Sequence, residues 1–270
     1  MAGAAAPPWA SSRPSRPVTE AGRASIDLSA YQALKARLVP RLRFNQVLYE
    51  EALTELVPSG GVWLDAGCGR RILPPWREAA ERELVHRARV VVGCDLDGEG
   101  IRAHRSLSRR VFADLEYLPF ETGSIDLVTA NMVVEHLDRP REVFQEMARV
   151  LKPGGRLILH TPNVYSHFVL GSRLLPWRVK RRLMRLLDGR EEEEVFPTRY
   201  RANSAPRLRS LLGAAGLVED WCRMVANDAL FARVHPTLAA LELLYIRLTL
   251  RPTFRFLRVT ILVSFSKPRG

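Results

Sequence analysis

The chain has 270 residues and a formal net charge of +12, with 47% hydrophobic and 26% charged residues. This composition is ordinary for a soluble globular protein and excludes a fibrous or wholly disordered chain. At this length we predict one domain with insertions over residues 28–270, preceded by a disordered tail over residues 1–27 that is rich in Ala, Pro and Ser.

The positive charge is concentrated in the last third of the chain. Residues 61–162 carry fifteen basic and fifteen acidic groups, whereas residues 163–270 carry nineteen basic groups against nine acidic ones. This asymmetry indicates contact with something anionic, such as a phosphorylated substrate, a membrane surface or nucleic acid, and a solvated arginine-rich surface is the alternative. Three scattered cysteines, Cys68, Cys94 and Cys222, do not form a disulfide framework or a zinc site, so we expect a reducing, cytoplasmic environment.

Strands and helices are predicted to alternate along most of the chain. Helical spacing over residues 28–38 and 45–57 predicts an N-terminal helical cover over residues 28–60. The predicted strands are residues 62–65, 90–95, 111–113, 125–130, 156–160, 217–225 and 259–265. The helices between them are predicted within residues 76–87, 98–107, 141–151, 204–214 and 238–248. This alternation predicts an α/β fold with a parallel sheet, helices on both faces, and ligands at the carboxyl ends of the strands.

The alternation fails over residues 163–200, which we predict to be a lid or binding insert. Residues 170–187 form a basic amphipathic stretch, and an acidic run follows at residues 191–194. A basic amphipathic helix can lie on an anionic membrane, so peripheral membrane contact through residues 170–187 is one hypothesis. A charged solvated face is the alternative.

A glycine turn follows the first predicted strand. The apolar run ends at Asp65, and Gly67 and Gly69 follow it, which is typical of a turn where a ligand approaches bare backbone. Such a turn binds either a dinucleotide pyrophosphate or S-adenosylmethionine. The pyrophosphate turn needs a third small residue, but this chain has Ile72 there, and the prolines at residues 74–75 delay the helix. The turn therefore favours S-adenosylmethionine.

Six motifs in order support this choice, and each has the spacing expected of one known family. They are residues 63–69 (WLDAGCG), 93–96 (GCDL), 113–120 (ADLEYLPF), 124–128 (SIDLV), 135–137 (EHL) and 149–155 (RVLKPGG). Over residues 43–162 the chain resembles class I S-adenosylmethionine-dependent methyltransferases, in particular the small-molecule group that includes quinone-biosynthesis enzymes. The resemblance implies a Rossmann-like, seven-stranded and mostly parallel sheet whose last strand is antiparallel.

The resemblance also implies a set of cofactor-binding residues. Those expected around the methionine part are Asp65, Gly67, Cys68 and Gly69. Asp95 would accept both ribose hydroxyls and Leu96 would pack on adenine. Asp114 would accept from the adenine amino group beside the Leu115 amide, and Asn131 would line the same cleft. The chain departs from the family's usual pattern at residues 70–71, which are two arginines in place of a further glycine.

The acceptor side is less defined. His136 is the candidate base for a hydroxyl acceptor, with a structural role as the alternative, and His160 and Asn163 are candidate substrate residues. Residues 130–133 lack the paired prolines typical of nucleic-acid amino-methyltransferases, so no specific nucleic acid is expected. The predicted function is methyl transfer to a small or lipid-like molecule, most simply to oxygen. A nicotinamide oxidoreductase, a non-catalytic S-adenosylmethionine-binding protein and, within the class, an RNA methyltransferase are the alternatives. The oligomeric state is left open.

Overall fold

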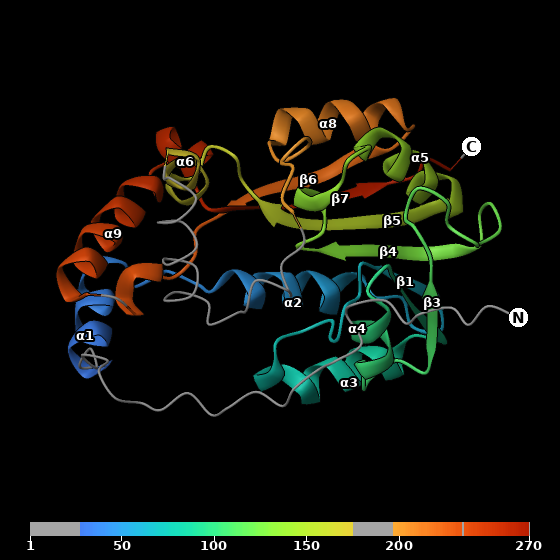
Figure 1. The fold of residues 1–270 in the computed structure, drawn as a ribbon, viewed down its shortest axis with the longest axis horizontal. Helices are drawn as coiled ribbons and strands as arrows, with labels where there is room; N and C mark the ends of the chain where they lie inside the picture. Colours follow the sequence, from blue (N-terminus) through green and yellow to red (C-terminus); the bar gives the residue numbers. More distant parts are fainter. Residues whose placement is uncertain (1–27, 175–196, 234, 270) are drawn as a thin grey trace, which may run out of the picture.

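A seven-stranded sheet forms the centre of the computed structural model, which describes residues 28–174, 197–233 and 235–269 (Figure 1). Its strands are β1 (Val62–Ala66), β2 (Val90–Asp95), β3 (Arg109–Phe112), β4 (Ile125–Asn131), β5 (Leu151–Pro162), β6 (Val218–Val225) and β7 (Thr260–Ser266). The strand order is β3-β2-β1-β4-β5-β7-β6, and β7 runs antiparallel to both of its neighbours. The predicted fold class is therefore confirmed.

Helices cover both faces of this sheet (Figure 1). They are α1 (Leu28–Leu38), α2 (Asn45–Leu56), α3 (Glu78–Arg87), α4 (Gly98–Ala103), α5 (Pro140–Val150), α6 (His167–Leu174), α8 (Ala205–Ala214) and α9 (Pro236–Thr249). Short 3₁₀ segments used below are η2 (Val134–His136), η4 (Leu230–Arg233) and η5 (Pro252–Leu257). Helices α5 and α8 lie on one face, and α2, α3 and α4 contribute to the core on the other.

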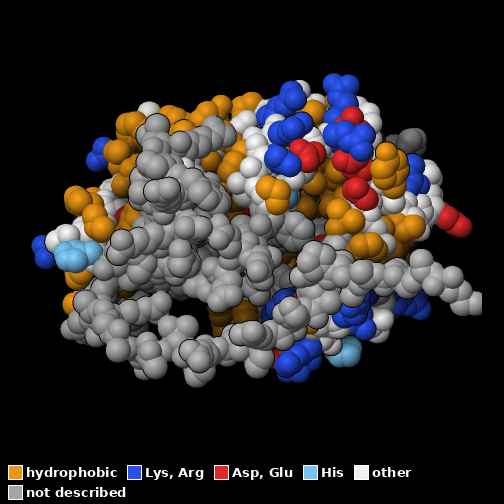
Figure 2. All heavy atoms as spheres, in the orientation of Figure 1, with side chains coloured by type: hydrophobic (Ala, Val, Ile, Leu, Met, Phe, Trp, Pro, Cys, Tyr) orange, Lys and Arg blue, Asp and Glu red, His pale blue; other side chains and the backbone are white. Residues whose placement is uncertain are grey.

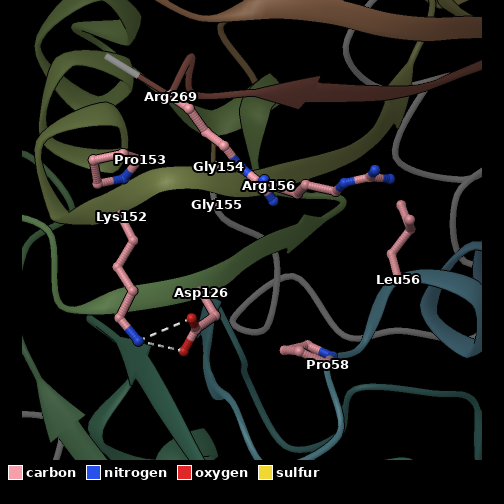
Figure 3. Close-up of a pocket in the computed structure, with 9 residues that line it drawn as sticks. All are labelled: Leu56, Pro58, Asp126, Lys152, Pro153, Gly154, Gly155, Arg156 and Arg269. Carbon is pink, nitrogen blue, oxygen red and sulfur yellow. Dashed lines mark hydrogen bonds and ion pairs between the residues drawn. The ribbon is translucent and has the colours of Figure 1, made fainter.

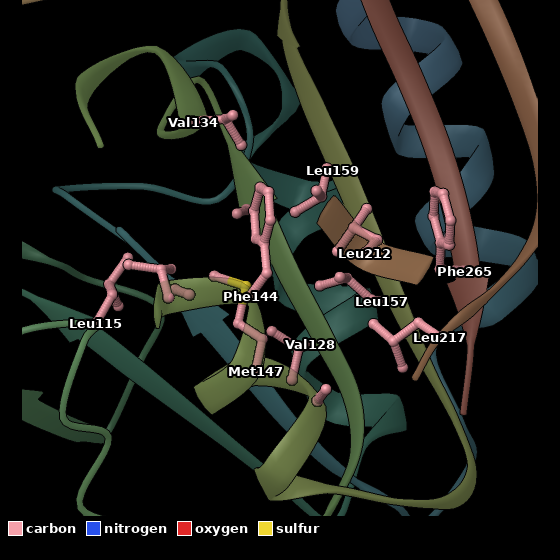
Figure 4. Packing of buried hydrophobic residues seen from close by; sticks show 14 of the residues in the cluster. Leu115, Val128, Val134, Phe144, Met147, Leu157, Leu159, Leu212, Leu217 and Phe265 are labelled. Carbon is pink, nitrogen blue, oxygen red and sulfur yellow. The ribbon is translucent and has the colours of Figure 1, made fainter. Parts of the chain in front are cut away.

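The first core layer shows why α5 forms where it does. Phe144 and Met147 recur at helical spacing and are fully buried against Val128 of β4 and Leu157 of β5, with Leu212 of α8 completing the layer (Figure 4). Truncating one such residue to alanine costs about 2–5 kcal/mol, so this layer is a main source of stability. On the opposite face, Tyr49 and Leu53 of α2 are buried beside Trp63 and Leu127. The predicted packing of the N-terminal helices on the sheet thus holds for α2.

A third, smaller cluster joins α1 to α9, which lie together at the left end of the molecule in Figure 1. Val39, Leu243 and Ile246 are buried there together with Ala226 and Ala229. Helix α1 therefore packs on α9 instead of on the sheet, which differs from the expected cover (Figure 1). The order of the chain did not reveal this contact, because the two helices are separated by almost the whole sequence.

Two predicted boundaries are wrong for identifiable reasons. Helix α4 ends at Ala103 and not near residue 107. The Arg110 guanidinium donates to the carbonyl oxygens of Ile101, Arg102 and His104, so a side chain from β3 takes up the carbonyls at the end of the helix. Strand β5 begins at Leu151, five residues earlier than predicted. Its pairing with β4 shifts register between Ile125 and Leu127, so the glycines at residues 154–155 form an irregularity within the strand.

Several expectations fall on residues outside the described ranges. These are the tail over residues 1–27, the acidic run at residues 191–194 and most of the amphipathic stretch at residues 170–187, of which only the end of α6 is described. Cys68, Cys94 and Cys222 are free cysteines in the structure. Among the helices that the structure describes, none combines the length and the apolar character needed to cross a membrane.

Candidate functional site

The glycine turn after β1 is held against the end of β2. The backbone N–H groups of Gly67 and Cys68 both donate to the Cys94 carbonyl, at 2.7 and 3.2 Å. Gly67 has a φ of +73°, and a Cβ there would lie 2.3 Å from a Val133 methyl carbon. Gly69 has a φ of +48°, but a Cβ there would meet no atom within 4 Å. The turn is therefore packed on its Gly67 side and open on its Gly69 side, where a ligand can approach.

Asp65 supports this turn from below. Its side chain is almost fully buried, and Oδ1 accepts a 2.6 Å hydrogen bond from the Thr129 hydroxyl, which in turn accepts from Trp63 Nε1 at 2.8 Å. Burial raises the pKa of Asp65 to about 7, and the bond from Thr129 opposes the rise. Asp65 is expected to frame the methionine part, and its bond from Thr129 fixes the carboxylate directly before the glycine turn.

Asp95 stands at the tip of β2 and faces the open side of the turn. Its Oδ2 accepts from the Gly69 N–H at 2.7 Å, and its Oδ1 accepts from the Asp97 N–H at 2.8 Å. A carboxylate oxygen has two acceptor sites, so each oxygen keeps one for a further donor such as a ribose hydroxyl. The next side chain, Leu96, is 52% exposed. A carboxylate with an apolar neighbour is a suitable surface for a nucleoside.

Asp114 extends the same edge beyond β3. The Ala113 N–H donates to the Asp95 carbonyl at 3.3 Å, which brings the two strand ends together. Asp114 is half-buried, and its Oδ1 accepts from the Glu116 N–H at 3.0 Å. The Leu115 side chain lies in the core, so only its backbone can face a ligand. Asp65, Asp95 and Asp114 therefore lie at the carboxyl ends of three adjacent strands, as predicted.

The ends of β4 and β5 form a second group. His160 Nδ1 donates to Asn131 Oδ1 at 2.8 Å, and Asn131 Nδ2 donates to Gln46 Oε1 of α2 at 3.2 Å. The Tyr49 ring stacks on His160 with a centroid distance of 5.7 Å. Burial lowers the pKa of His160 to about 4, so its ring is neutral at physiological pH. His160 is fully buried and holds Asn131, and its role as a substrate residue stays a prediction.

The residue after Asn131 is strained. Met132 adopts a φ of 59°, which non-glycine residues rarely do, and its N–H donates to the His160 carbonyl at 2.7 Å. Its side chain is exposed. Strain of this kind costs about 1–3 kcal/mol and persists where the surrounding structure enforces it. The hydrogen bonds of Asn131 and His160 hold Met132 in this conformation. They lie at the same edge of the sheet as the candidate cofactor residues.

His136 and Asn163 take different positions. His136 lies on η2 with 30% of its side chain exposed, and its Nδ1 donates to the Pro197 carbonyl at 3.2 Å. Asn163 is fully buried, and its Nδ2 donates to the carbonyls of Phe256 and Arg258, both at 2.7 Å. Its amide thus joins η5 to the end of β5, and a substrate role for Asn163 stays a prediction.

Sequence reasoning missed the residues that hold this edge together. Thr129 and Gln46 contact predicted residues but lie in segments that showed no motif of their own. Glu135 is also buried, and its Oε2 accepts from the Thr161 hydroxyl at 2.9 Å. Burial raises the pKa of Glu135 to about 7. Two signals in the sequence could have indicated these residues. Thr129 is a single polar residue inside an apolar strand, and Glu135 belongs to the motif at residues 135–137.

The two arginines after Gly69 face different surroundings. Arg70 is exposed, whereas Arg71 lies close enough to the end of α4 to affect His104. Burial lowers the pKa of His104, and the charges of Arg110 and Arg71 lower it further. Ile72 is buried in the core, so no third small residue is available for a pyrophosphate.

A hollow of about 280 Å³ lies at the opposite end of the sheet and is not part of this site (Figure 3). There Lys152 Nζ contacts both oxygens of Asp126 at 2.7 and 2.8 Å, and Asp126 also accepts from the Val62 N–H. Asp126 is near the amino end of β4, away from the strand ends that hold Asp95 and Asp114. The contacts of Asp126 and Lys152 join the starts of β1, β4 and β5.

Known proteins share this fold and sequence pattern. Residues 64–159 match a family described as a methyltransferase domain. The chain is 31% identical to a ubiquinone biosynthesis O-methyltransferase from Xanthomonas axonopodis pv. citri over 51% of this chain and 61% of that protein. It is 32% identical to a malonyl-[acyl-carrier protein] O-methyltransferase from Methylovorus sp. over 52% of this chain and 49% of that protein. The chain thus spans about half the length of these curated relatives.

A solved structure supports the fold over more of the chain. The methyltransferase solved in complex with the Trm112 methyltransferase activator of Haloferax volcanii has a TM-score of 0.56 and 19% identity, covering 89% of this chain and 94% of that one. Fold, strand-end carboxylates and glycine turn together agree with the methyltransferase domain that residues 64–159 match. Residues 64–159 therefore match a methyltransferase domain, which confirms the family resemblance over this part of the chain.

Proposed function

We propose that this chain transfers a methyl group from S-adenosylmethionine to an oxygen atom of a small or lipid-like molecule. The observation that carries the proposal is the arrangement of Asp95 and Asp114 beside the open face of Gly69, within a matched methyltransferase domain. Two relatives named O-methyltransferases support oxygen as the acceptor atom. The oxidoreductase, binding-only and RNA alternatives have no observation that favours them over this function.

The proposed cofactor contacts follow the geometry of the edge. Asp95 accepts both ribose hydroxyls through the acceptor sites left by its backbone bonds, and Leu96 packs on adenine. Asp114 and the Leu115 backbone receive the adenine edge. The open turn at Gly67–Gly69, including Cys68, receives the methionine part, and Asn131 lines the cleft beside it. Asp65 acts through the turn that it supports.

The cofactor supplies an electrophilic methyl group on a sulfonium centre. The residues of the chain must align the acceptor oxygen in line with that methyl and exclude competing water, so little acid-base machinery is required. Asn131 is held by His160 and Gln46, and Met132 projects beside it. These residues form the acceptor side in our proposal.

His136 is the proposed base for a hydroxyl acceptor. We expect His136→Gln to lower kcat about 100-fold while leaving the affinity for S-adenosylhomocysteine unchanged, because a positioned base contributes to the reaction and not to cofactor binding. Measuring kcat against pH tests this role, since the variant should lose the fall in rate on the acidic side that an imidazole base produces. An unchanged pH profile with reduced kcat would instead assign His136 a positioning role through its bond to Pro197.

A comparison of ligands tests the proposed cofactor. We expect S-adenosylhomocysteine to raise the melting temperature of the protein in a thermal-shift assay, whereas NAD should not, because the turn lacks a pyrophosphate site. Stabilisation by NAD alone would overturn the proposal. Mass spectrometry of metabolites and lipids from cells with and without the gene should then identify the acceptor as a product that gains one methyl group.

Peripheral contact with an anionic membrane through residues 170–187 remains a proposal, together with a cytoplasmic location. It is supported by the basic amphipathic pattern of that stretch. Only its first residues, at the end of α6, are described by the structure.

A further inference from the structure

Helix α9 has two apolar faces, and only one of them is packed. Ala239, Leu243 and Ile246 are buried against the cluster shared with α1. A second stripe at helical spacing faces solvent, with exposed fractions of 42% for Leu238, 63% for Leu241, 49% for Leu244 and 37% for Leu248. An ordinary surface helix has polar residues on the side away from its core. The second stripe of α9 therefore has the pattern of a face that is covered by something else.

Exposed arginines accompany this stripe. Arg247 is one helical turn from Leu244 on α9, and Arg251 follows the helix, where its N–H donates to the Leu248 carbonyl at 3.1 Å. Arg255 and Phe256 of η5 are exposed just beyond the end of α9. We call the surface formed by Leu238, Leu241, Leu244, Arg247 and Leu248 of α9, together with Arg251 just after it, the α9 face.

The α9 face has no acidic counterpart nearby in sequence. Within the described residues 235–269, Glu242 is the one acidic residue, and it is buried. Its carboxylate oxygens face His167 Nε2 at 3.1 Å and the Phe231 N–H at 2.8 Å, so its charge is used inside the molecule. The exposed charge of this segment is therefore entirely positive.

The α9 face is built on rigid contacts. The Arg258 guanidinium donates to the carbonyls of Thr249, Leu250 and Met224, which fixes the end of α9 against β6. The Tyr245 hydroxyl donates to the Leu257 carbonyl and holds η5 in place. The surface is therefore held in a fixed position on the fold.

Helix α6 lies beside it and adds further apolar exposure. The His167 ring contacts Tyr245 of α9 with a centroid distance of 4.4 Å, and the next residue, Phe168, is exposed. Hydrophobic side chains are visible along the left and upper-left margin of Figure 2, the end of the molecule where Figure 1 places α9 and α6. Apolar patches that extend over neighbouring elements in this way mark interaction sites.

We propose that the α9 face binds the surface of an anionic phospholipid bilayer. Leucines next to arginines match such a surface, because the leucines can enter the acyl boundary while the arginines meet lipid phosphates. A helix of 14 residues is about 21 Å long and would lie in the plane of the interface. This inference goes beyond methyl transfer, and it concerns described residues that are separate from the stretch at 170–187.

A second copy of this chain fits the α9 face less well. A two-fold interface brings the same patch of both copies together. Arg247 and Arg251 would then face an equally basic surface, on which the described residues 235–269 expose no carboxylate. Anionic lipid provides the missing negative charge, whereas a dimer through this face would bury like charges.

Vesicle binding of the full chain tests the proposal. The probes are vesicles of phosphatidylglycerol with phosphatidylcholine and vesicles of phosphatidylcholine alone, and binding is measured by co-sedimentation. We expect Arg247→Gln with Arg251→Gln to weaken binding to the anionic vesicles about 30-fold, since each arginine near such a surface contributes about fivefold. We expect Leu241→Glu with Leu244→Glu to weaken it on the order of tenfold or more. Glutamate forms helix nearly as well as leucine, so α9 should remain folded.

Matched controls separate this face from general charge and apolar exposure. Arg141→Gln with Arg207→Gln removes two exposed arginines elsewhere, and Val218→Glu replaces an exposed apolar residue of β6. Both controls should bind within about twofold of the original chain, and all variants should keep their affinity for S-adenosylhomocysteine. The proposal is overturned if the original chain binds anionic vesicles no better than neutral ones, or if the α9-face variants bind like the controls. A dimer that becomes monomeric in Leu241→Glu with Leu244→Glu would show a protein interface instead.

Discussion

Replacing Asp95 with alanine is expected to weaken the affinity for S-adenosylhomocysteine on the order of 1000-fold. The loss comprises two hydrogen bonds from ribose hydroxyls to a carboxylate, each worth about 1.5–3 kcal/mol. The open acceptor sites on Asp95, next to the exposed Leu96, are the reason to expect both bonds. Isothermal titration calorimetry measures the change directly.

Two further variants separate cofactor contact from loop stability. Asp95 also accepts from the Gly69 N–H, so its removal loosens the turn, and Asp95→Asn keeps an acceptor for that bond. Asp97 is the matched control, because it accepts from the Glu99 N–H at the start of α4 and has no proposed cofactor contact. Asp97→Ala should lower the free energy of unfolding by about 1 kcal/mol and leave the affinity within about twofold. An unchanged affinity in Asp95→Ala would remove the assignment of the ribose site.

The strand-end carboxylates could be predicted from the sequence because each follows an apolar run. A parallel sheet aligns the carboxyl ends of its strands, so Asp95 and Asp114 had to lie at one edge. The role of Asp65 was not predictable in the same way. Its partner Thr129 is 64 residues away and was one polar residue within an apolar strand. Local patterns identify where a strand ends, whereas the direction of a side chain depends on what the neighbouring strand offers.

The acceptor side shows the same limit more strongly. Asn163 and His160 looked alike in sequence, as polar residues near the end of one strand. In the fold Asn163 holds η5 and His160 holds Asn131, both through partners that are far away in the chain. Arg110, which ends α4, gave no local signal either, since its three carbonyl acceptors are defined only once β3 is in place. The residue types alone did not indicate the structural roles of Asn163, His160 and Arg110. Their long-range hydrogen bonds determine those roles.

Helix α2 is linked to the candidate cleft through these bonds. Gln46 accepts from Asn131, and Tyr49 stacks on His160, so two residues of one helical turn contact the ends of β4 and β5. The strained Met132 is attached to the same group through the His160 carbonyl. A change in α2 would therefore alter the acceptor side even though α2 carries no motif. This coupling gives α2 a positioning role in the proposed function.

The buried Glu135 should make the stability of the protein depend on pH. Burial raises its pKa from 4.5 to about 7, and the hydroxyl of Thr161 opposes the rise. Because the folded pKa is higher than the unfolded one, the folded state favours the protonated carboxyl. The stabilisation from this proton is fully present below about pH 4.5 and is lost as the pH rises through about 7. The shift corresponds to a change of about 3 kcal/mol in the free energy of unfolding.

Glu135→Gln replaces the carboxyl with a neutral group of the same shape that can still accept from Thr161. We therefore expect the variant to match the original protein near pH 4 and to exceed its free energy of unfolding by about 3 kcal/mol at pH 8. Urea unfolding at several pH values measures this difference. The pKa of Asp65 is also raised, but Asp65 is present in both proteins, so its contribution to the pH dependence cancels in the comparison. Glu55→Gln on the exposed side of α2 is the matched control and should leave the pH dependence unchanged. A constant difference between Glu135→Gln and the original protein across this range would contradict a buried titrating carboxyl, because only a proton that binds differently to the folded and unfolded chains produces a pH-dependent gap.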